Sequence, residues 1–239
     1  MKGVLAIRAP GVPVVDVTHG VPARDVRAGA LVLRHAAPFF PRGAVHVAVI
    51  DPGVGGARRP IAIETGRALF VGPDNGVLTL AAPPDARRRV VELTNAHYLP
   101  RLRSQTFHGR DVFAPMAAAL ALGVELGALG PAVDDAVEHD LPSPRVERDG
   151  TIVGEIVYVD HFGNLVSNVT GESVASGEHF ITIGDMAVGP LSTSYADVDS
   201  GRPLAVVNSW ELIEIAVRDG SARAVLGLDR GAPIRARPA

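Results

Sequence analysis

The chain has 239 residues, 47% of them hydrophobic, which is enough for one large domain or two modest ones with a substantial buried core. Its net charge of -3 creates no general attraction for nucleic acid or an anionic membrane, so we expect a small polar ligand as its partner. Because there is no cysteine, disulfides, thiolate metal sites and cysteine nucleophiles are excluded, and a cytoplasmic location is expected.

In the first half of the chain, short apolar runs alternate with helix-like segments. This pattern is typical of strand–helix–strand units and predicts an α/β fold with a mostly parallel sheet. The spacing of apolar residues predicts a helix over 23–34, and the apolar run 45–50 predicts a strand buried on both faces. The other expected elements are strands over 61–63 and 68–71 around a turn at 65–67, and a helix over 111–122.

The composition of the sequence changes where prolines cluster at 141–145. We therefore expect an α/β domain over 1–141, a linker over 142–149 and a small antiparallel β-barrel domain over 150–239. The expected strands of the second domain are 154–160, 180–183, 204–207 and 213–217.

Asp51 is the first candidate for chemistry, because it follows the strongest predicted strand. Open parallel sheets bind ligands at the carboxyl ends of their strands. The glycines of the segment 51–56 allow close approach of the main chain, but their spacing fits neither a phosphate-binding loop nor a dinucleotide fingerprint. A plain turn that ends a strand, with a capping aspartate, explains the segment equally well.

Three further segments carry polar groups in turn-like surroundings. Residues 72–76 include Asn75, residues 106–111 include Thr106 and His108, and residues 160–164 combine a carboxylate, an aromatic ring and an amide. A histidine can titrate near neutral pH, and the third set suits hydroxyl recognition and ring stacking. Each segment also has an ordinary structural interpretation, as a turn or a helix cap.

A metal site and a serine hydrolase are the alternatives considered from motifs. The candidate metal ligands do not have the spacing of known motifs, so no metal is expected, and Asp111 is better explained as a helix cap. The candidate ligands are Asp16, His19, His46, Asp51, His108 and Asp111. The Gly-x-Ser-x-Gly segment of a serine hydrolase is absent.

Taken in order, the segments resemble the S-adenosylmethionine hydrolases, also called SAM hydroxide adenosyltransferases, which are relatives of the fluorinases and chlorinases. The resemblance extends over essentially the whole chain. It is carried by Asp16–His19, Asp51–Gly55 with Arg58 and Arg59, Phe70–Gly76, Thr106–Asp111, Asp160–Asn164, and Asn208 and Ser209 followed by Glu214–Ala216.

The resemblance implies hydrolysis of S-adenosyl-L-methionine to adenosine and L-methionine by water attack at C5′, with no cofactor. It also implies an N-terminal α/β domain, a C-terminal β-barrel and a homotrimer with active sites between subunits. Asp51, Arg58 and His108 match the residues that activate water, with Arg58 preferred to Arg59 on spacing. The residues implied in substrate binding are Asn75, Thr106, Asp160, Phe162, Asn164, Ser209 and Ala216.

The carboxylate of Asp51 favours water over a halide as the nucleophile, because a negative charge at the reacting centre would repel an anion. By the family pattern, halogenases have an uncharged residue there and a serine near the place of Gly109. Family members begin upstream of the segment that is Met1–Val4 here, with a strand and an acidic residue for the ribose, which we expect to be missing from this chain. A non-catalytic trimeric protein that binds adenosine or S-adenosylmethionine is the main alternative, and a halogenase the weaker one.

Overall fold

The computed structural model describes residues 1–82, 87–101, 103–175 and 177–239. The chain forms two compact units, Met1–Asp140 and Leu141–Ala239. None of the helices in the described part of the chain is long and apolar enough to cross a membrane.

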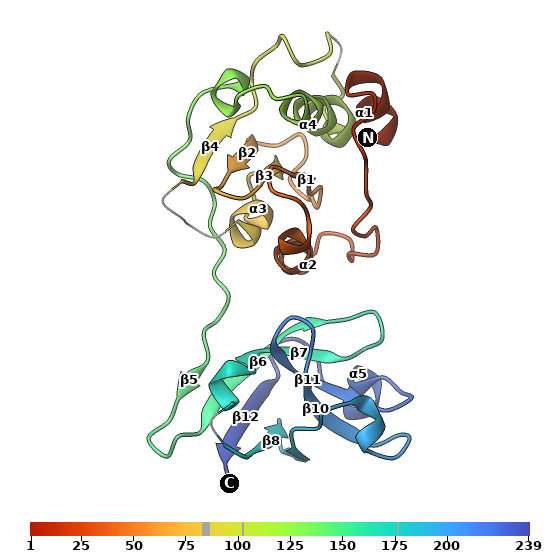
Figure 1. Ribbon diagram of the computed structural model, residues 1–239, viewed down its shortest axis with the longest axis vertical. Coiled ribbons are helices and arrows are strands. Elements are labelled where there is room, and N and C mark those ends of the chain that lie inside the picture. The colour runs from red at the N-terminus through yellow and green to blue at the C-terminus, as the bar shows by residue number, and fades with distance from the viewer. Residues whose placement is uncertain (83–86, 102, 176) are drawn as a thin grey trace. The chain divides into compact units, whose positions relative to one another are not determined.

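The first unit is a four-stranded sheet covered by helices. Its strands are β1 (Val45–Val47), β2 (Pro60–Glu64), β3 (Leu69–Pro73) and β4 (Arg89–Glu92), in the order β1-β3-β2-β4. Its helices are α1 (Lys2–Arg8), α2 (Val26–Ala36), α3 (Val77–Ala81) and α4 (Ala114–Ala121), with short 3₁₀ turns at Ala37–Phe39 and Leu126–Leu129. Figure 1 shows α1 and α4 on one face of the sheet and α2 and α3 on the other. The α/β class predicted from the sequence is therefore confirmed.

The sheet is mixed, whereas the sequence predicted a mostly parallel one. Among the strands that the structure describes in this sheet, only β1 and β3 run parallel; β2 is antiparallel to both β3 and β4. The reason is the predicted turn at 65–67, which is present: it joins β2 directly to β3 as a hairpin, and so short a connection allows only antiparallel pairing.

Several predicted boundaries in the first unit were wrong. The strand predicted over 45–50 ends at Val47, and the exposed Val49 shows that it is not buried on both faces along its length. The helix predicted over 23–34 is Val26–Ala36, because Asp25 accepts a hydrogen bond from the Ala28 amide and caps it there. The helix predicted over 111–122 begins as a π turn, Gly109–Phe113, that leads into α4.

The second unit is an antiparallel sheet curled into a nearly closed barrel. Its strands are β5 (Arg145–Val146), β6 (Ile152–Val159), β7 (Leu165–Thr170), β8 (His179–Ile183), β9 (Met186–Pro190), β10 (Pro203–Val207), β11 (Leu212–Val217) and β12 (Pro233–Pro238). They follow the order β10-β11-β7-β6-β12-β8-β9, with β5 paired to β6, and a bridge from Leu191 to Ala205 brings the two ends together. Two 3₁₀ turns, Glu172–Val174 and Tyr195–Asp197, and helix α5 (Ala222–Leu226) complete the unit. All four strands predicted for this half of the chain are present, but β5 lies within the predicted linker 142–149.

Candidate functional site

The loop after β1 carries Asp51 and is packed against a second loop that carries His108. Gly55 has a φ of +77°, and a Cβ atom at that position would lie 2.8 Å from the carbonyl oxygen of Gln105. Only glycine allows the two loops to approach this closely in this conformation. Gly55 therefore allows the loop of Asp51 to lie directly beside the segment that precedes His108.

Asp51 and Arg58 form a buried ion pair across this loop. Arg58 Nε donates to Asp51 Oδ1 at 2.9 Å, and Arg58 Nη2 donates to Asp51 Oδ2. The two side chains are 5% and 8% exposed, respectively. The guanidinium carbon of Arg58 also lies 5.4 Å from the centre of the Phe113 ring, a distance typical of a cation–π contact. Such a two-point pair fixes the orientation of the carboxylate.

His108 joins the pair through its Nδ1, which lies 2.7 Å from Arg58 Nη2. Since arginine can only donate, Nδ1 accepts, and a neutral imidazole then carries its proton on Nε2. Burial, followed by the positive charge of Arg58, lowers the pKa of His108 below its ordinary value. The ring is therefore neutral at pH 7 and offers one N–H donor.

Arg58 has donors left over after these contacts. Of its five N–H groups, three are directed to Asp51 and His108. Nη1 carries the other two; it is buried and has no hydrogen-bond partner among the residues that the structure describes. A buried donor without an acceptor is costly, so this atom is suited to an oxygen atom bound at the site.

Arg59 is directed elsewhere. Its Nε and Nη2 lie 2.9 Å and 2.6 Å from Asp74 Oδ2, and its Nη1 lies 2.6 Å from Asp135 Oδ1. The structure thus brings Arg58, and not Arg59, to Asp51 and His108. Sequence spacing alone left the two arginines nearly equivalent, because their partners are distant in the chain.

The side chains of Thr106 and Asn75 differ in their exposure and in their hydrogen bonds. Thr106 is exposed, with its hydroxyl 3.4 Å from Ser104 Oγ. Asn75 has both of its polar side-chain atoms on main-chain partners: Nδ2 donates to the Ile50 carbonyl at 2.8 Å, and Oδ1 accepts from the Val77 amide at 3.2 Å. This engagement makes Asn75 part of the framework around Asp51.

A hollow of about 360 Å³ lies beside Asp51 in the first unit. Its lining residues are Val21–Arg24 and Val49–Pro52.

Asp111, predicted as a helix cap, does not cap α4: it is buried, accepts from the Ser104 amide at 2.8 Å and pairs with Arg110. Among the described residues, no group of three or more His, Cys, Asp or Glu side chains is arranged to hold a metal ion.

In the second unit, Asp160 organises the turn between β6 and β7. Its Oδ1 accepts from the amides of Phe162 and Asn164, at 2.9 Å and 2.8 Å, and its Oδ2 accepts from Asn164 Nδ2 at 3.0 Å. The Phe162 ring is 74% exposed, which leaves a flat apolar surface beside a carboxylate and an amide. Ser209 is also exposed, whereas Ala216 is buried in β11 against Leu204.

The sequence reasoning assigned no role to Glu214, which is 4% exposed in the middle of β11. Its carboxylate accepts from Tyr195 Oη at 2.7 Å and from Asn208 Nδ2 at 3.1 Å. Burial, with Glu214 and then Asp160 nearby, raises the pKa of Tyr195. A carboxylate inside an otherwise apolar strand was the available signal, because such a group needs partners.

Both units are similar to known proteins. Residues 1–130 match the family model of the SAM hydroxide adenosyltransferase N-terminal domain, and residues 154–235 match that of the C-terminal domain. A protein of Salinispora arenicola named (R)-S-adenosyl-L-methionine hydrolase is 46% identical over 98% of this chain and 89% of its own length. A fluorinase of an Actinoplanes species is 27% identical over 90% of this chain and 84% of its own. A crystal structure of an uncharacterized conserved protein from Thermotoga maritima aligns with a TM-score of 0.89 and 32% identity, over 99% of this chain and 93% of that one.

Proposed function

Because the chain belongs to the SAM hydroxide adenosyltransferase family, we propose that it hydrolyses S-adenosyl-L-methionine to adenosine and L-methionine. The observation that carries the proposal is the buried set of Asp51, Arg58 and His108, with Arg58 Nη1 left to bind an oxygen atom. S-Adenosyl-L-methionine is the substrate, and the reaction as written uses no cofactor.

In the proposed reaction, a water oxygen forms a bond to C5′ while the bond from C5′ to sulfur breaks. The electron pair of that bond stays on sulfur, which leaves as the neutral thioether of methionine, so no acid is needed for the leaving group. Asp51 takes the proton of the attacking water. Arg58 occupies one acceptor position on each carboxylate oxygen, and each oxygen keeps a second one for this task.

Arg58 and His108 support the developing hydroxide in different ways. Arg58 Nη1 supplies N–H donors and positive charge, which stabilise negative charge on the oxygen. The neutral His108 offers its Nε2–H as a further donor and adds no second positive charge beside a cationic sulfonium.

We assign substrate recognition to Thr106 of the first unit and to residues of the second unit. Asn75, which the family resemblance also implies in binding, we assign to the framework instead, because both of its polar side-chain atoms have main-chain partners. The exposed ring of Phe162 suits stacking on a purine, and the groups of Asp160, Asn164 and Ser209 suit hydrogen bonds to polar parts of the substrate. Ala216 is kept from the family resemblance alone, since its side chain is buried.

The negative charge of Asp51 favours hydrolysis over halogenation. A halide placed against the buried carboxylate of Asp51 would be repelled at close range. Water carries no charge and can use the same carboxylate as a proton acceptor.

The test is to incubate the purified protein with S-adenosyl-L-methionine in ¹⁸O-labelled water and to follow the products by mass spectrometry, with chloride and fluoride controls. Labelled adenosine together with methionine supports hydrolysis. A halogenated adenosine would indicate a halogenase, and binding without any product would indicate a non-catalytic binding protein.

A homotrimer is also part of the proposal and rests on the family resemblance. Sedimentation analysis should give three times the chain mass of 24.9 kDa, and a monomer mass would contradict it. The cytoplasmic location stays a prediction from the sequence.

A further inference from the structure

The turn Asp74–Gly76, which follows β3, touches the loop of Asp51 and Arg58 at two points. Two adjacent side chains of the turn, Asp74 and Asn75, make these contacts. Each of them reaches the residue next to one partner of the buried ion pair. The turn therefore holds both ends of the loop that carries the pair.

Asn75 holds the end at Asp51. Its Nδ2 donates to the carbonyl of Ile50, the residue immediately before Asp51, at 2.8 Å. Strand β1 has already ended at Val47, so its pairing with β3 does not extend to Ile50. The second polar atom of Asn75 is fixed by the Val77 amide at the start of α3, which makes the side chain a rigid link.

Asp74 holds the end at Arg58 through the next residue, Arg59. Its Oδ2 accepts from Arg59 Nε and Nη2, and its amide donates to the Arg59 carbonyl at 2.9 Å. Oδ1 accepts from the Val137 amide at 2.8 Å, so the carboxylate is anchored on its other side as well. Both the main chain and the side chain of Arg59 are therefore fixed to one buried residue.

The loop between these two anchors contains Gly53, Gly55 and Gly56. Glycine gives a loop more conformational freedom than any other residue, so the loop itself does little to define where its ends lie. A catalytic pair needs its groups held within about 0.5 Å of the productive arrangement. That precision has to come from outside the loop.

We propose that Asp74 and Asn75 are positioning residues that set the geometry of Asp51 and Arg58 by holding Ile50 and Arg59. Neither side chain touches the substrate in this role. The role of these two residues in turnover rests on the proposed hydrolysis, whereas their effect on the geometry of Arg58 can be measured without it.

Asn95 provides a matched control in the same unit. Its Nδ2 donates to a distant carbonyl, that of Ala128, at 2.7 Å, and its Oδ1 accepts from the amide two residues later, that of His97, at 2.9 Å. Asn75 has the same two kinds of bond, but Asn95 lies outside the loops that carry Asp51, Arg58 and His108. The variants Asn75→Ala and Asn95→Ala therefore remove equivalent bonds at two places.

The first measurement is the steady-state hydrolysis of S-adenosyl-L-methionine, with melting temperatures recorded for each variant. Asn75→Ala should lower kcat by about 10- to 100-fold, as expected for a small displacement of catalytic groups, while KM changes by less than about threefold. Asn95→Ala should lose a similar amount of melting temperature and keep the wild-type kcat. Equal kcat values for the two variants would overturn the proposal.

Asn75→Asp separates the two bonds of Asn75. It keeps an acceptor for the Val77 amide but has no donor for the Ile50 carbonyl, so the turn is retained while the link to Asp51 is lost. This variant should fold like the wild type and show the same loss of kcat as Asn75→Ala. A wild-type kcat in a folded Asn75→Asp protein would contradict the proposal.

The second measurement needs no substrate: the Nε–Hε resonance of Arg58 by nuclear magnetic resonance, assigned by its loss in Arg58→Lys. The resonance should shift or broaden in Asn75→Ala and stay in place in Asn95→Ala. An unchanged resonance in Asn75→Ala would overturn the positioning role. If the wild-type protein shows no hydrolysis, the proposed function fails, and this resonance still decides the positioning role.

Discussion

At the scale of single residues, the site depends on how three side chains divide their hydrogen bonds. Arg58 satisfies Asp51 and His108 with three N–H groups and keeps two for a bound oxygen. These contacts join residues from two separate loops. The sequence was enough to name the candidate residues. It did not show which of Arg58 and Arg59 pairs with Asp51, because that depends on the contact between Arg59 and Asp74, which lies 15 residues away.

The substitution Asp51→Asn tests the proton acceptor. The amide keeps the shape of the carboxylate but not its basicity, so hydrolysis should fall by at least about 10²-fold, the range of a general base. Titration calorimetry should still detect binding of S-adenosyl-L-methionine. Asp149→Asn, in an exposed turn of the second unit, is the control and should keep full activity. Equal loss of binding and activity would mean that Asp51 is a binding or structural residue.

The pH dependence of kcat/KM tests the neutral state of His108. Burial, followed by the charge of Arg58, lowers the pKa of His108 below its ordinary value of about 6.5, so the neutral ring predominates at pH 7. Protonated Nδ1 would face the Arg58 donor with another donor, and activity should therefore fall on the acid side, with its midpoint below pH 6.5. A midpoint above pH 6.5, or the same acid limb in His108→Gln, would contradict this assignment.

At the scale of elements, local sequence patterns predicted the strands and helices better than they predicted how the strands pair and where they end. The hairpin of β2 and β3 follows from two apolar runs around one turn, and four barrel strands follow from apolar runs between turn residues. The end of β1 at Val47 could not be read from the sequence, because it depends on β3 as a neighbour. The π turn before α4 ends at Phe113, which is buried in the core of the first unit, and the sequence alone does not show that contact.

Gly163, in the turn between β6 and β7, connects this turn to helix α5. It has a φ of +85°, and an added Cβ atom would lie 2.0 Å from Ser221 Oγ and 2.9 Å from Ser221 Cβ. Ser221 caps α5 through the Ala224 amide, so Gly163→Ala combines backbone strain with loss of a cap. Together these effects should cost about 2–3 kcal/mol of unfolding free energy.

The control for this substitution is Gly227→Ala, at the end of α5. Gly227 has a φ of +66° but no heavy atom within 4 Å of an added Cβ, so only backbone strain of about 1 kcal/mol is expected there. Urea denaturation of both variants measures the difference. If Gly163→Ala costs no more than Gly227→Ala, Ser221 accommodates the extra atom.

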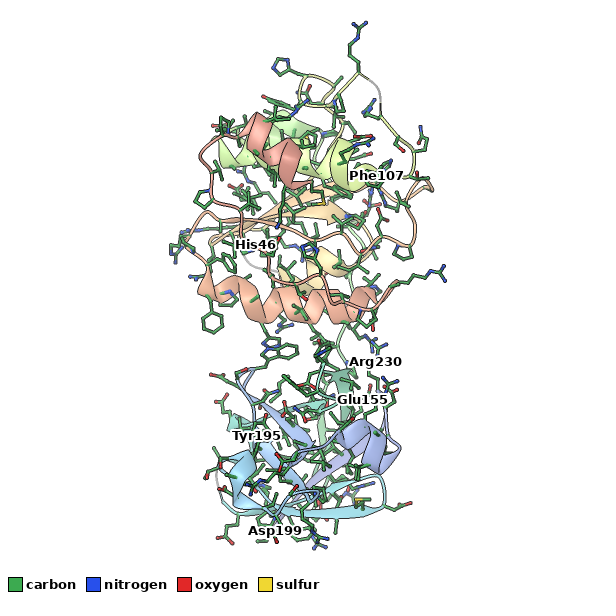
Figure 2. The ribbon with its side chains drawn as sticks, turned by 90° about the vertical axis from the view of Figure 1, so that its right-hand side faces the viewer. His46, Phe107, Glu155, Tyr195, Asp199 and Arg230 are labelled. Atoms are coloured by element: carbon green, nitrogen blue, oxygen red, sulfur yellow. The ribbon has the colours of Figure 1, made fainter. Side chains whose placement is uncertain are left out.

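At the scale of the whole molecule, each unit has its own apolar core, and buried polar groups inside these cores link folding to pH. His46, the titratable residue of β1, is 6% exposed and is labelled in Figure 2. Its ring lies between Phe40 and Phe70, with centroid distances of 5.2 Å and 5.1 Å, and its Nε2 has no partner among the described residues. Burial, followed by Arg67, lowers its pKa.

His46 should make the protein less stable in acid. Its pKa is lower in the folded than in the unfolded chain, so the unfolded chain binds more protons, and the free energy of unfolding falls as pH drops below 6.5. His46→Phe, which suits the aromatic surroundings, should reduce this fall between pH 7.5 and 5.5 in urea denaturation. The exposed His97→Phe is the control; if both variants keep the wild-type slope, His46 does not contribute to it.

The burial of the Asp51–Arg58 pair also has a consequence for ionic strength. Dissolved ions screen exposed charges over about 8 Å at 0.15 M, but they cannot enter between two enclosed partners. The attraction between Asp51 and Arg58 should therefore change little with the salt concentration of the solution. Only the diffusional encounter of a cationic sulfonium with a protein of net charge -3 should respond to added salt.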